Sequence, residues 1–193
     1  MKKNYRYAIF LFIIIIVLFF CSIGIVTLFQ DKKIEIEKVD ETDVAFVSDA
    51  NSIVINNIIS VSDEFGKSIH ESTDGDFGYL EFEVVNNTNE IRNYQIYITR
   101  LYSNYKEINP NYISFYLTDE NNNVLKGFDT NKCPSYDDFK FIEDKADSKY
   151  IYKGSLKGNE RKKFIVRAWI AENYVVDHSI EEQFAFNIGA RAY

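Results

Sequence analysis

The side chains that could carry out catalysis are few in this sequence and stand far apart. The chain has two histidines, His70 and His178, and neither belongs to a motif that pairs it with a serine or cysteine nucleophile. His178 begins the pattern His-Ser-Ile-Glu181, which lacks the second histidine of the zinc-protease helix His-Glu-x-x-His. We therefore predict that the protein is not an enzyme and uses no cofactor. A metal-dependent surface enzyme is the alternative that stays open.

One acidic turn resembles part of a calcium-binding loop but fails the rest of the pattern. Asp119, Asn121 and Asn123 have the one-three-five spacing of calcium ligands. The loop also requires glycine at its sixth position and glutamate at its twelfth, where this chain has Val124 and Thr130. We interpret the turn as the connection of a β-hairpin, and we predict no metal ligand in it.

Two further loops and the one cysteine beyond the N-terminal segment are weaker candidates. The loops around residues 74–76 and 137–144 are acidic, and we interpret them as solvated charge rather than as calcium sites. Cys133 has no second cysteine in the same domain, so no internal disulfide can form there. Neighbouring acids raise the pKa of a thiol and make it less nucleophilic. We expect Cys133 to be buried or inert.

The most distinctive candidate is the pair Arg167 and Trp169, which lie two residues apart in a segment with strand-like alternation. Alternate residues of a strand point to opposite faces of the sheet. One face is wholly apolar and belongs in the core; it consists of Phe164, Val166, Ala168 and Ile170. The opposite face carries Arg167 and Trp169, which are the candidate binding site for a partner. The interpretation favoured over binding is that the indole packs beneath a loop or against tyrosine rings.

A β-sheet must position these residues, because the chain beyond residue 51 alternates with a period of two. In one clear example Leu80, Phe82 and Val84 face one way, while Glu81 and Glu83 face the other. Such segments recur roughly every 10–15 residues, number about seven to nine, and are separated by turns rich in Asn, Asp and Gly. We predict an all-β fold, an antiparallel two-sheet sandwich of the Ig-like or jelly-roll-like kind.

We expect little helix in this domain. Residues 66–78 are polar and contain Gly, Ser and Asp, which favours a loop. Ser135 precedes two acidic residues, a pattern that favours an N-cap and a short helix over residues 135–139.

The N-terminal segment predicts a membrane anchor. From Ala8 to Phe29 the chain is apolar and carries no charge, and as a helix it would span about 33 Å, enough for a hydrocarbon core of about 30 Å. Lys2, Lys3 and Arg6 precede this run, and the positive-inside rule places them in the cytoplasm. The predicted organisation is a cytoplasmic tail (1–7), a transmembrane helix (8–29), a charged stalk (30–50) and an extracytoplasmic domain (51–193).

Two other fates of the N-terminal segment were weighed against an uncleaved anchor. The apolar run is longer than the core of a signal peptide, which has about 7–15 residues, and more apolar chain follows the small residues Ser22 and Gly24. Cys21 could accept a lipid, but Leu-Phe-Phe precedes it, which fits a lipoprotein signal poorly. The uncleaved anchor is therefore the leading prediction, and cleavage with release of the domain is the alternative.

Charge narrows the classes of partner. All 29 acidic residues follow residue 29, and three of the 22 basic residues precede it, which leaves a formal charge of −10 on the domain and stalk. Such a surface has no basic face with which to displace phosphate counterions, so we predict no nucleic-acid partner. Anionic lipid headgroups would also repel it. The predicted partners are the membrane, through the anchor, and an unidentified protein or component of the cell envelope.

The C-terminal part of the chain carries a family resemblance. It includes Tyr150-Ile-Tyr-Lys-Gly-Ser-Leu-Lys-Gly-Asn-Glu160, the strand Phe-Ile-Val-Arg167-Ala-Trp169-Ile and a terminal Phe-Ala-Phe-Asn-Ile188. In these features it resembles small membrane-anchored surface proteins of Gram-positive bacteria, which are loosely similar to camelysin-like and biofilm-fibre proteins. The resemblance implies an extracytoplasmic β-sandwich and transfers no catalytic residue.

Together these observations predict a single-pass, membrane-anchored cell-surface protein of bacteria that acts by binding or assembly. The alternative from another class is a secreted fibre or matrix subunit that a signal peptidase releases. The chain has no evident cleavage site, which sets it apart from the fibre-forming members of the family that it resembles.

Overall fold

A computed structural model of the chain describes residues 41–71, 76–128 and 131–193. The residues predicted to form a cytoplasmic tail, a transmembrane helix bounded by Ala8 and Phe29, and the first half of a stalk lie outside these ranges. Among the residues that are described, no helix has both the length and the apolar character that a membrane crossing requires. The anchor therefore stays a prediction.

The folded part of the described chain begins within the segment that the sequence assigned to the stalk. A 3-10 turn, η1 (Glu41–Asp43), leads directly into the first strand, β1 (Val44–Val47). Val44 is buried in the core. The domain thus takes its first strand from residues before position 51.

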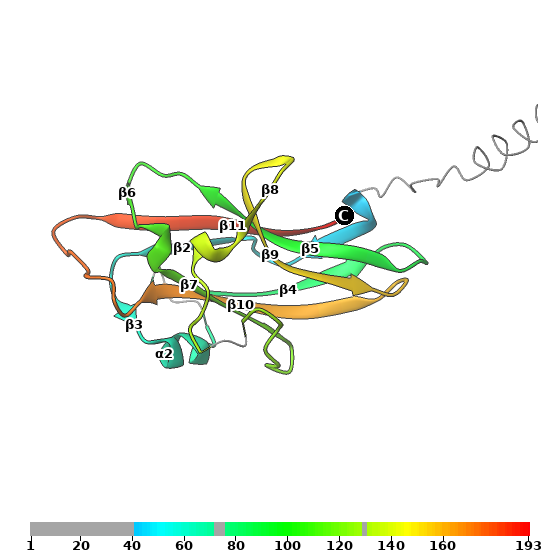
Figure 1. Ribbon diagram of the computed structural model, residues 1–193, viewed down its shortest axis with the longest axis horizontal. Coiled ribbons are helices and arrows are strands. Elements are labelled where there is room, and N and C mark those ends of the chain that lie inside the picture. Colours follow the sequence, from blue (N-terminus) through cyan, green and yellow to red (C-terminus); the bar gives the residue numbers. More distant parts are fainter. Residues whose placement is uncertain (1–40, 72–75, 129–130) are drawn as a thin grey trace, which may run out of the picture. The chain divides into compact units, whose positions relative to one another are not determined.

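Two β-sheets face each other (Figure 1). In the first, sheet A, β10 is central, with β4 and then β1 on one side and β7 on the other, while the short β3 extends the β4 side. The strands that accompany β1 are β3 (Ser60–Val61), β4 (Gly78–Asn86), β7 (Ile113–Asp119) and β10 (Arg161–Ala171).

The second sheet, sheet B, follows the order β2, β11, β5, β9 and β8, and β6 pairs with the beginning of β11. Its strands are β2 (Ser52–Asn56), β5 (Arg92–Leu101), β6 (Lys106–Glu107), β8 (Lys140–Ile142), β9 (Lys145–Leu156) and β11 (Glu182–Ala192). A register shift between Ile96 and Tyr97 bulges β9 where it pairs with β5.

The two-sheet β-sandwich confirms the prediction of an all-β fold. Eight of the described strands have four or more residues, within the predicted range, and the three others, β3, β6 and β8, have two or three. Alternation cannot reveal so short a strand, because the pattern does not repeat within it. Two of the short strands, β3 and β6, pair in parallel, and the other strand pairs of the described part are antiparallel.

Aromatic side chains connect the two sheets through the core. Phe115 of β7 contacts Phe186 of β11 with ring centroids 5.2 Å apart. Tyr94 of β5 meets Phe164 of β10 at 6.2 Å, and Phe164 in turn stacks on Phe82 of β4 at 5.6 Å. Such pairs add about 0.5–1.5 kcal/mol each to the stabilisation that burial of their area provides. The predicted core face of the Arg167 segment, including Phe164, lies in this core.

The structure corrects the expectation of a loop at residue 66. A helix, α2 (Asp63–Ser68), occupies this position, with Ser62 as its N-cap and acidic residues in its first turn. Its six residues are too few to show a helical period in the sequence. The predicted short helix after Ser135 is found as the 3-10 turn η3 (Tyr136–Asp138), closed by a capping box between Ser135 and Asp138.

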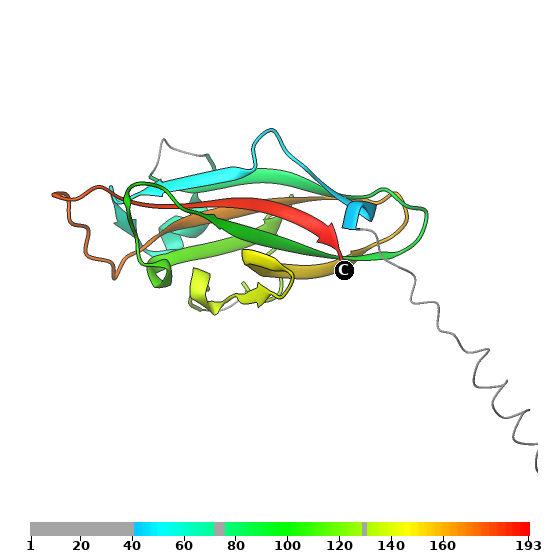
Figure 2. The same ribbon diagram turned by 90° about the horizontal axis from the view of Figure 1, so that it is seen from above.

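The described chain begins and ends at the same end of the sandwich (Figures 1 and 2). There the Asn87 N–H donates to the Asp43 carbonyl, and the Tyr193 N–H donates to the Asn93 carbonyl. We call this the entry end. Three connections meet at the opposite end, which we call the loop end: residues 57–59 after β2, 102–105 after β5 and 172–181 after β10.

Candidate functional site

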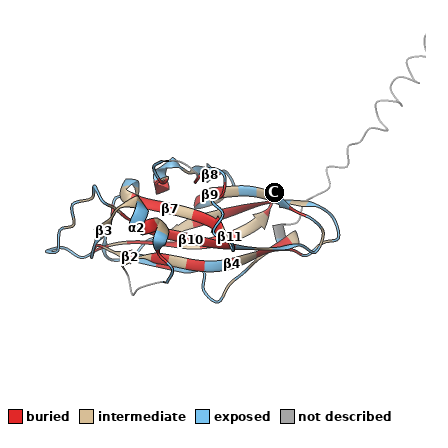
Figure 3. Ribbon diagram, turned by 90° about the horizontal axis from the view of Figure 1, so that it is seen from below, coloured by how far each residue is buried: buried red, intermediate tan, exposed pale blue. Residues whose placement is uncertain are grey.

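Arg167 and Trp169 lie on the outer face of sheet A, opposite the central core, as the alternation predicted. This face is nevertheless covered by the protein's own chain. Trp169 is fully buried, and Arg167 is 5% exposed. The indole forms a second, smaller core with Ile69 and Cys133. Figure 3 shows α2 against the face of sheet A that β10 and β7 form. This placement agrees with the packing interpretation, and in this conformation a partner has no access to either side chain.

The indole is held by an unusually close approach of α2. A Cβ added at Gly66 would lie 2.1 Å from Cε2 of Trp169, so only glycine fits at this point of the helix. The indole Nε1 has no hydrogen-bond partner among the described residues. The indole of Trp169, more than a hundred residues later in the chain, thus explains why position 66 is a glycine.

Arg167 connects three segments through neutral acceptors. Its Nε donates to the Ile69 carbonyl at 2.6 Å, its Nη1 to Thr118 Oγ1 at 3.1 Å and its Nη2 to Asn122 Oδ1 at 2.9 Å. Burial lowers the pKa of Arg167, although a guanidinium stays charged at neutral pH. Its hydrogen bonds therefore join β10 to the residue after α2 and to the β7 turn.

The rings that face the Arg167 guanidinium belong to tyrosines rather than to Trp169. The ring centroids of Tyr79 and Tyr116 lie 5.6 and 6.0 Å from Arg167 Cζ. The Tyr79 hydroxyl donates to Glu81, so a carboxylate completes the surroundings without pairing directly with the arginine. The arrangement is that of a structural cation held by hydrogen bonds and aromatic faces.

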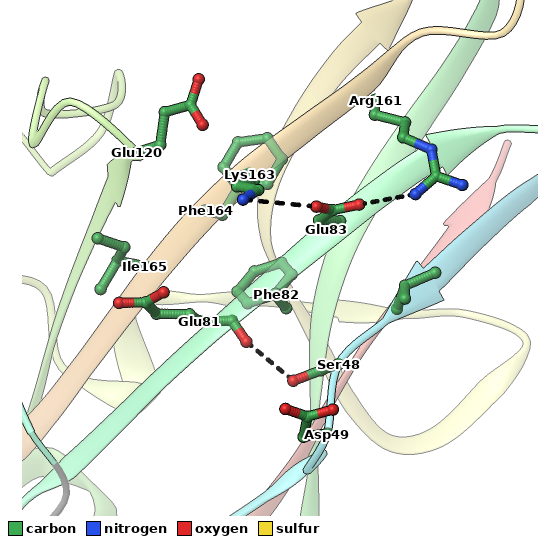
Figure 4. Close-up of a pocket in the computed structure, with 11 residues that line it drawn as sticks. Ser48, Asp49, Glu81, Phe82, Glu83, Glu120, Arg161, Lys163, Phe164 and Ile165 are labelled. Atoms are coloured by element: carbon green, nitrogen blue, oxygen red, sulfur yellow. Dashed lines mark hydrogen bonds and ion pairs between the residues drawn. The ribbon is translucent and has the colours of Figure 1, made fainter.

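A pocket of about 570 Å³ lies farther along the outer face of sheet A (Figure 4). Its wall is made by β4 and β10 and by the residues that follow β1. Glu83 is paired there with Arg161 at 3.1 Å and with Lys163 at 3.8 Å, and Ser48 Oγ donates to the Glu81 carbonyl at 2.8 Å. These two ion pairs share one carboxylate, and exposed pairs of this kind contribute little to stability.

The loop end gathers exposed apolar side chains from three connections that are remote in sequence. Val175 is 86% exposed and Tyr102 is 66% exposed. The full set is Ile58 and Ile59 in the first loop, Tyr102 and Tyr105 in the second, and Val175 and Ile180 in the third. Ile58 and Tyr105 line one pocket, and hydrogen bonds from Asn57 join the first loop to the third. Exposed apolar side chains that gather on one surface are typical of interaction sites. We name these six residues the loop-end cluster.

A buried amide fixes the longest of the three loops. Asn57 Nδ2 donates to the carbonyls of Asp177 and Ile180 at 3.1 and 2.7 Å, and its Oδ1 accepts from the Glu182 N–H at 3.1 Å. Asp177 also closes its own turn, because its carboxylate accepts from the Ser179 N–H and hydroxyl. These hydrogen bonds fix the conformation of the 172–181 loop and therefore of the surface at the loop end.

A buried carboxylate supports the same end of the sandwich. Glu182, at the start of β11, is ion-paired with Lys106 at 2.5 Å and accepts a hydrogen bond from the Tyr174 hydroxyl. The bonds from Lys106 and Tyr174 lower the pKa of Glu182. Burial, and then the bond to Glu182, raise the pKa of Tyr174 to about 12. This triad ties β6 and the 172–181 loop to β11.

Of the other residues that the sequence singled out, positions 74 and 75 of the first acidic loop lie outside the described residues, and the two considered next have structural roles. The Asp119 carboxylate accepts from the N–H groups of Asn121 and Asn123, both at 2.9 Å, which confirms the hairpin turn. Cys133 is buried, and desolvation, with a smaller effect of Asp63, raises the pKa of its thiol to about 12. Across the described residues, no group of three His, Cys, Asp or Glu side chains could hold a metal ion.

The loop-end cluster was not predicted from the sequence. A signal was present, because large apolar residues such as Tyr105, Val175 and Ile180 stand in segments interpreted as loops. An apolar residue in a loop is informative only when others lie beside it, and alternation does not show which loops share an end of the sandwich. The described residues thus form an all-β, two-sheet sandwich that carries the loop-end cluster at one end. No family model matches the chain, and no curated protein matches it significantly.

Proposed function

We propose that the protein is a single-pass, membrane-anchored β-sandwich on the outside of the cell that binds a component of the cell envelope through its loop end. In this proposal the N-terminal tail is cytoplasmic, residues 8–29 cross the membrane, and the domain acts by binding rather than by catalysis. The proposal also places the chain with the small surface proteins of Gram-positive bacteria that its C-terminal strands resemble.

One observation carries the proposal: the loop-end cluster lies at the end of the sandwich opposite the entry end. The described chain begins at the entry end, so the loop end is the end of the domain that lies farther from residue 41. Solvent-exposed apolar residues that are held by buried hydrogen bonds, such as those of Asn57, supply contact area at low cost in conformational entropy. The net negative charge of the domain favours such a distal contact over one with anionic lipid.

A photo-crosslinking amino acid at Val175 tests the proposal in the cells that make the protein. Val175 is 86% exposed at the loop end, and Ile91, which is 69% exposed near the entry end, is the matched control. We expect discrete crosslinked products from position 175 and none of the same mass from position 91. Equal products from both positions, or none from position 175, would contradict a binding role for the loop end.

The mass of the mature protein separates the anchored form from a released fibre subunit. An N-terminus at Met1 or Lys2 in the membrane fraction supports the anchor. A mature N-terminus near Ile25 or Gln30 in the medium would replace it with the secreted alternative.

A further inference from the structure

We propose that a pocket among the loop-end connections binds an uncharged, hydroxyl-rich ligand, that is, a segment of a neutral glycan. This inference rests on the proposed binding role of the loop end and gives that role a ligand class. It is carried by the pocket, by the unused hydrogen-bonding groups in its wall and by the balance of its charges.

The pocket has a volume of about 340 Å³, which falls in the range of small-ligand sites. It lies where β2 ends, where the 102–105 loop turns back and where β11 begins. Its wall consists of Asn56, Asn57, Ile58, Tyr105, Glu181, Glu182 and Gln183. Three of these seven residues carry a side-chain amide and two carry a carboxylate, so the wall is rich in hydrogen-bonding groups.

Part of this hydrogen-bonding capacity is not used by the protein. Gln183 Nε2 donates to Asn56 Oδ1 at 3.1 Å, which leaves Asn56 Nδ2 and Gln183 Oε1 without a partner among the described residues. If both amides were turned over, one donor and one acceptor would still remain. A hydroxyl group both donates and accepts, so adjacent sugar hydroxyls can satisfy such a pair of groups together.

The charges of the pocket select against an anionic ligand. Glu181 and Glu182 both line it, so an anion would meet like charge. The neighbouring Lys106 is paired with Glu182 at 2.5 Å, so that carboxylate offsets its positive charge. The Lys106 ion pair uses the Glu182 carboxylate. The carboxylate of the exposed Glu181 can still accept hydrogen bonds from a ligand.

Tyr105 and Ile58 give the pocket an apolar side. Tyr105 is 52% exposed and Ile58 is 50% exposed. A sugar ring presents C–H groups on one face and hydroxyls around its edge, and a tyrosine ring is an amphipathic surface that can pack against such a face. The pocket therefore combines a partly exposed aromatic ring with amide groups, which is a suitable combination for a neutral sugar.

Binding of neutral oligosaccharides to the full chain in lipid nanodiscs tests the inference. Nanodiscs are used because they avoid sugar-based detergents, which could compete for the site. The neutral probes are oligomers of N-acetylglucosamine, glucose, galactose and mannose, and polyglycerol phosphate is the anionic comparison. We expect one of the neutral oligomers to bind and the polyphosphate not to bind. Failure of every neutral oligomer, or tighter binding of the anionic polymer, would overturn the proposal.

Matched variants locate the site. We expect Tyr105→Ala and Gln183→Ala to weaken binding by about tenfold or more, the effect of losing about one good contact. Asn104→Ala, in the same loop but outside the pocket wall, and Asn187→Ala, on the same strand, should bind like the wild type. Circular dichroism and the melting temperature verify that each variant is folded.

Undiminished binding by both folded pocket variants would refute the assigned site. Crosslinking at Val175 is independent of this result. Protein crosslinks without glycan binding would refute the glycan inference and leave the binding role of the loop end in place. Glycan binding that no pocket variant changes, together with no crosslinks at Val175, would refute both.

Discussion

Gly66 of α2 lies directly against the indole of Trp169, and this contact leaves no room for a side chain at position 66. The relationship explains why a short helix covers the outer face of sheet A and why a lone tryptophan stands on that face. Trp169 is the only tryptophan in the chain, so its fluorescence reports directly on whether α2 shields it from solvent.

We predict that Gly66→Ala destabilises the protein. Helix propensity favours alanine over glycine by about 1 kcal/mol, but overpacking against a buried ring costs about 1–3 kcal/mol. The clash should therefore outweigh the propensity, because the indole is fully buried and has no space into which to move. The free energy of unfolding from urea titration measures the effect.

Ser68→Ala, at an exposed position of the same helix, is the control and should change stability little. Trp169 fluorescence gives a second readout. Iodide should quench the wild type weakly and Gly66→Ala more strongly, because α2 must move away from the ring. A Gly66→Ala protein as stable and as well shielded as the wild type would show that α2 does not cover Trp169 in solution.

We predict that Arg167→Lys destabilises the fold although it keeps the charge. The guanidinium reaches acceptors on three separate segments, and a single ammonium cannot match that fork. Buried acceptors that lose their donor cost about 1–3 kcal/mol. Arg161→Lys is the control on the same strand, since Arg161 is exposed and its pair with Glu83 contributes little. Equal stability of the two variants would contradict a structural role for the Arg167 hydrogen bonds.

We predict that Asn57→Ala loosens the 172–181 loop. The change removes the bonds to the carbonyls of Asp177 and Ile180 and to the Glu182 N–H, at a cost of about 1–3 kcal/mol. Limited proteolysis should cut this loop faster than in the wild type. Asn104→Ala, an exposed asparagine of the neighbouring loop, should be cut like the wild type. Cleavage rates that do not differ would mean that Asn57 does not hold the loop.

We predict that stability falls as the pH rises above about 10, the ordinary pKa of tyrosine. Burial raises the pKa of Tyr136 to about 12 and is also the largest cause of the rise to about 12 at Tyr79 and Tyr174. A raised pKa means that the fold disfavours the phenolate. Its contribution is therefore complete below the unfolded pKa and is lost as the pH rises toward the folded one.

Melting temperatures between pH 8 and pH 12 measure this loss, and the absorbance of tyrosinate follows the ionisation itself. Tyr136→Phe, which removes one of the titrating groups, should flatten the decline. Cys133 acts in the same direction, since burial raises the pKa of its thiol from an ordinary 9.0 to about 12. A melting temperature that stays constant up to pH 12 would show that these hydroxyls are not buried in solution.

Local alternation was enough to predict the sandwich, because the apolar residues within each strand show which of its two faces is buried. Leu80, Phe82 and Val84 were expected in the core and lie there. The turn at Asp119 was also predictable, since its side chain bonds to the backbone two and four residues away. Such features are determined by residues that are close in sequence, so the sequence is sufficient to predict them.

The state of Arg167 and Trp169 could not be obtained in this way. Their strand face was predicted correctly, but whether that face meets solvent depends on α2, which lies about a hundred residues earlier and is too short to show a period. The same holds for the loop end. The Asn57 N–H donates to the Glu182 carbonyl, and the Glu182 N–H donates to Asn57 Oδ1, across more than a hundred residues.

The sequence by itself thus determined an acidic, alternating, all-β domain behind an apolar N-terminal segment, because composition and period are local properties. Only the tertiary structure decided which polar and aromatic side chains are buried and which loops meet. Burial is a property of packing between distant segments, and it made Arg167 and Trp169 parts of the interior. The same packing brought the 57–59, 102–105 and 172–181 connections to one end of the sandwich.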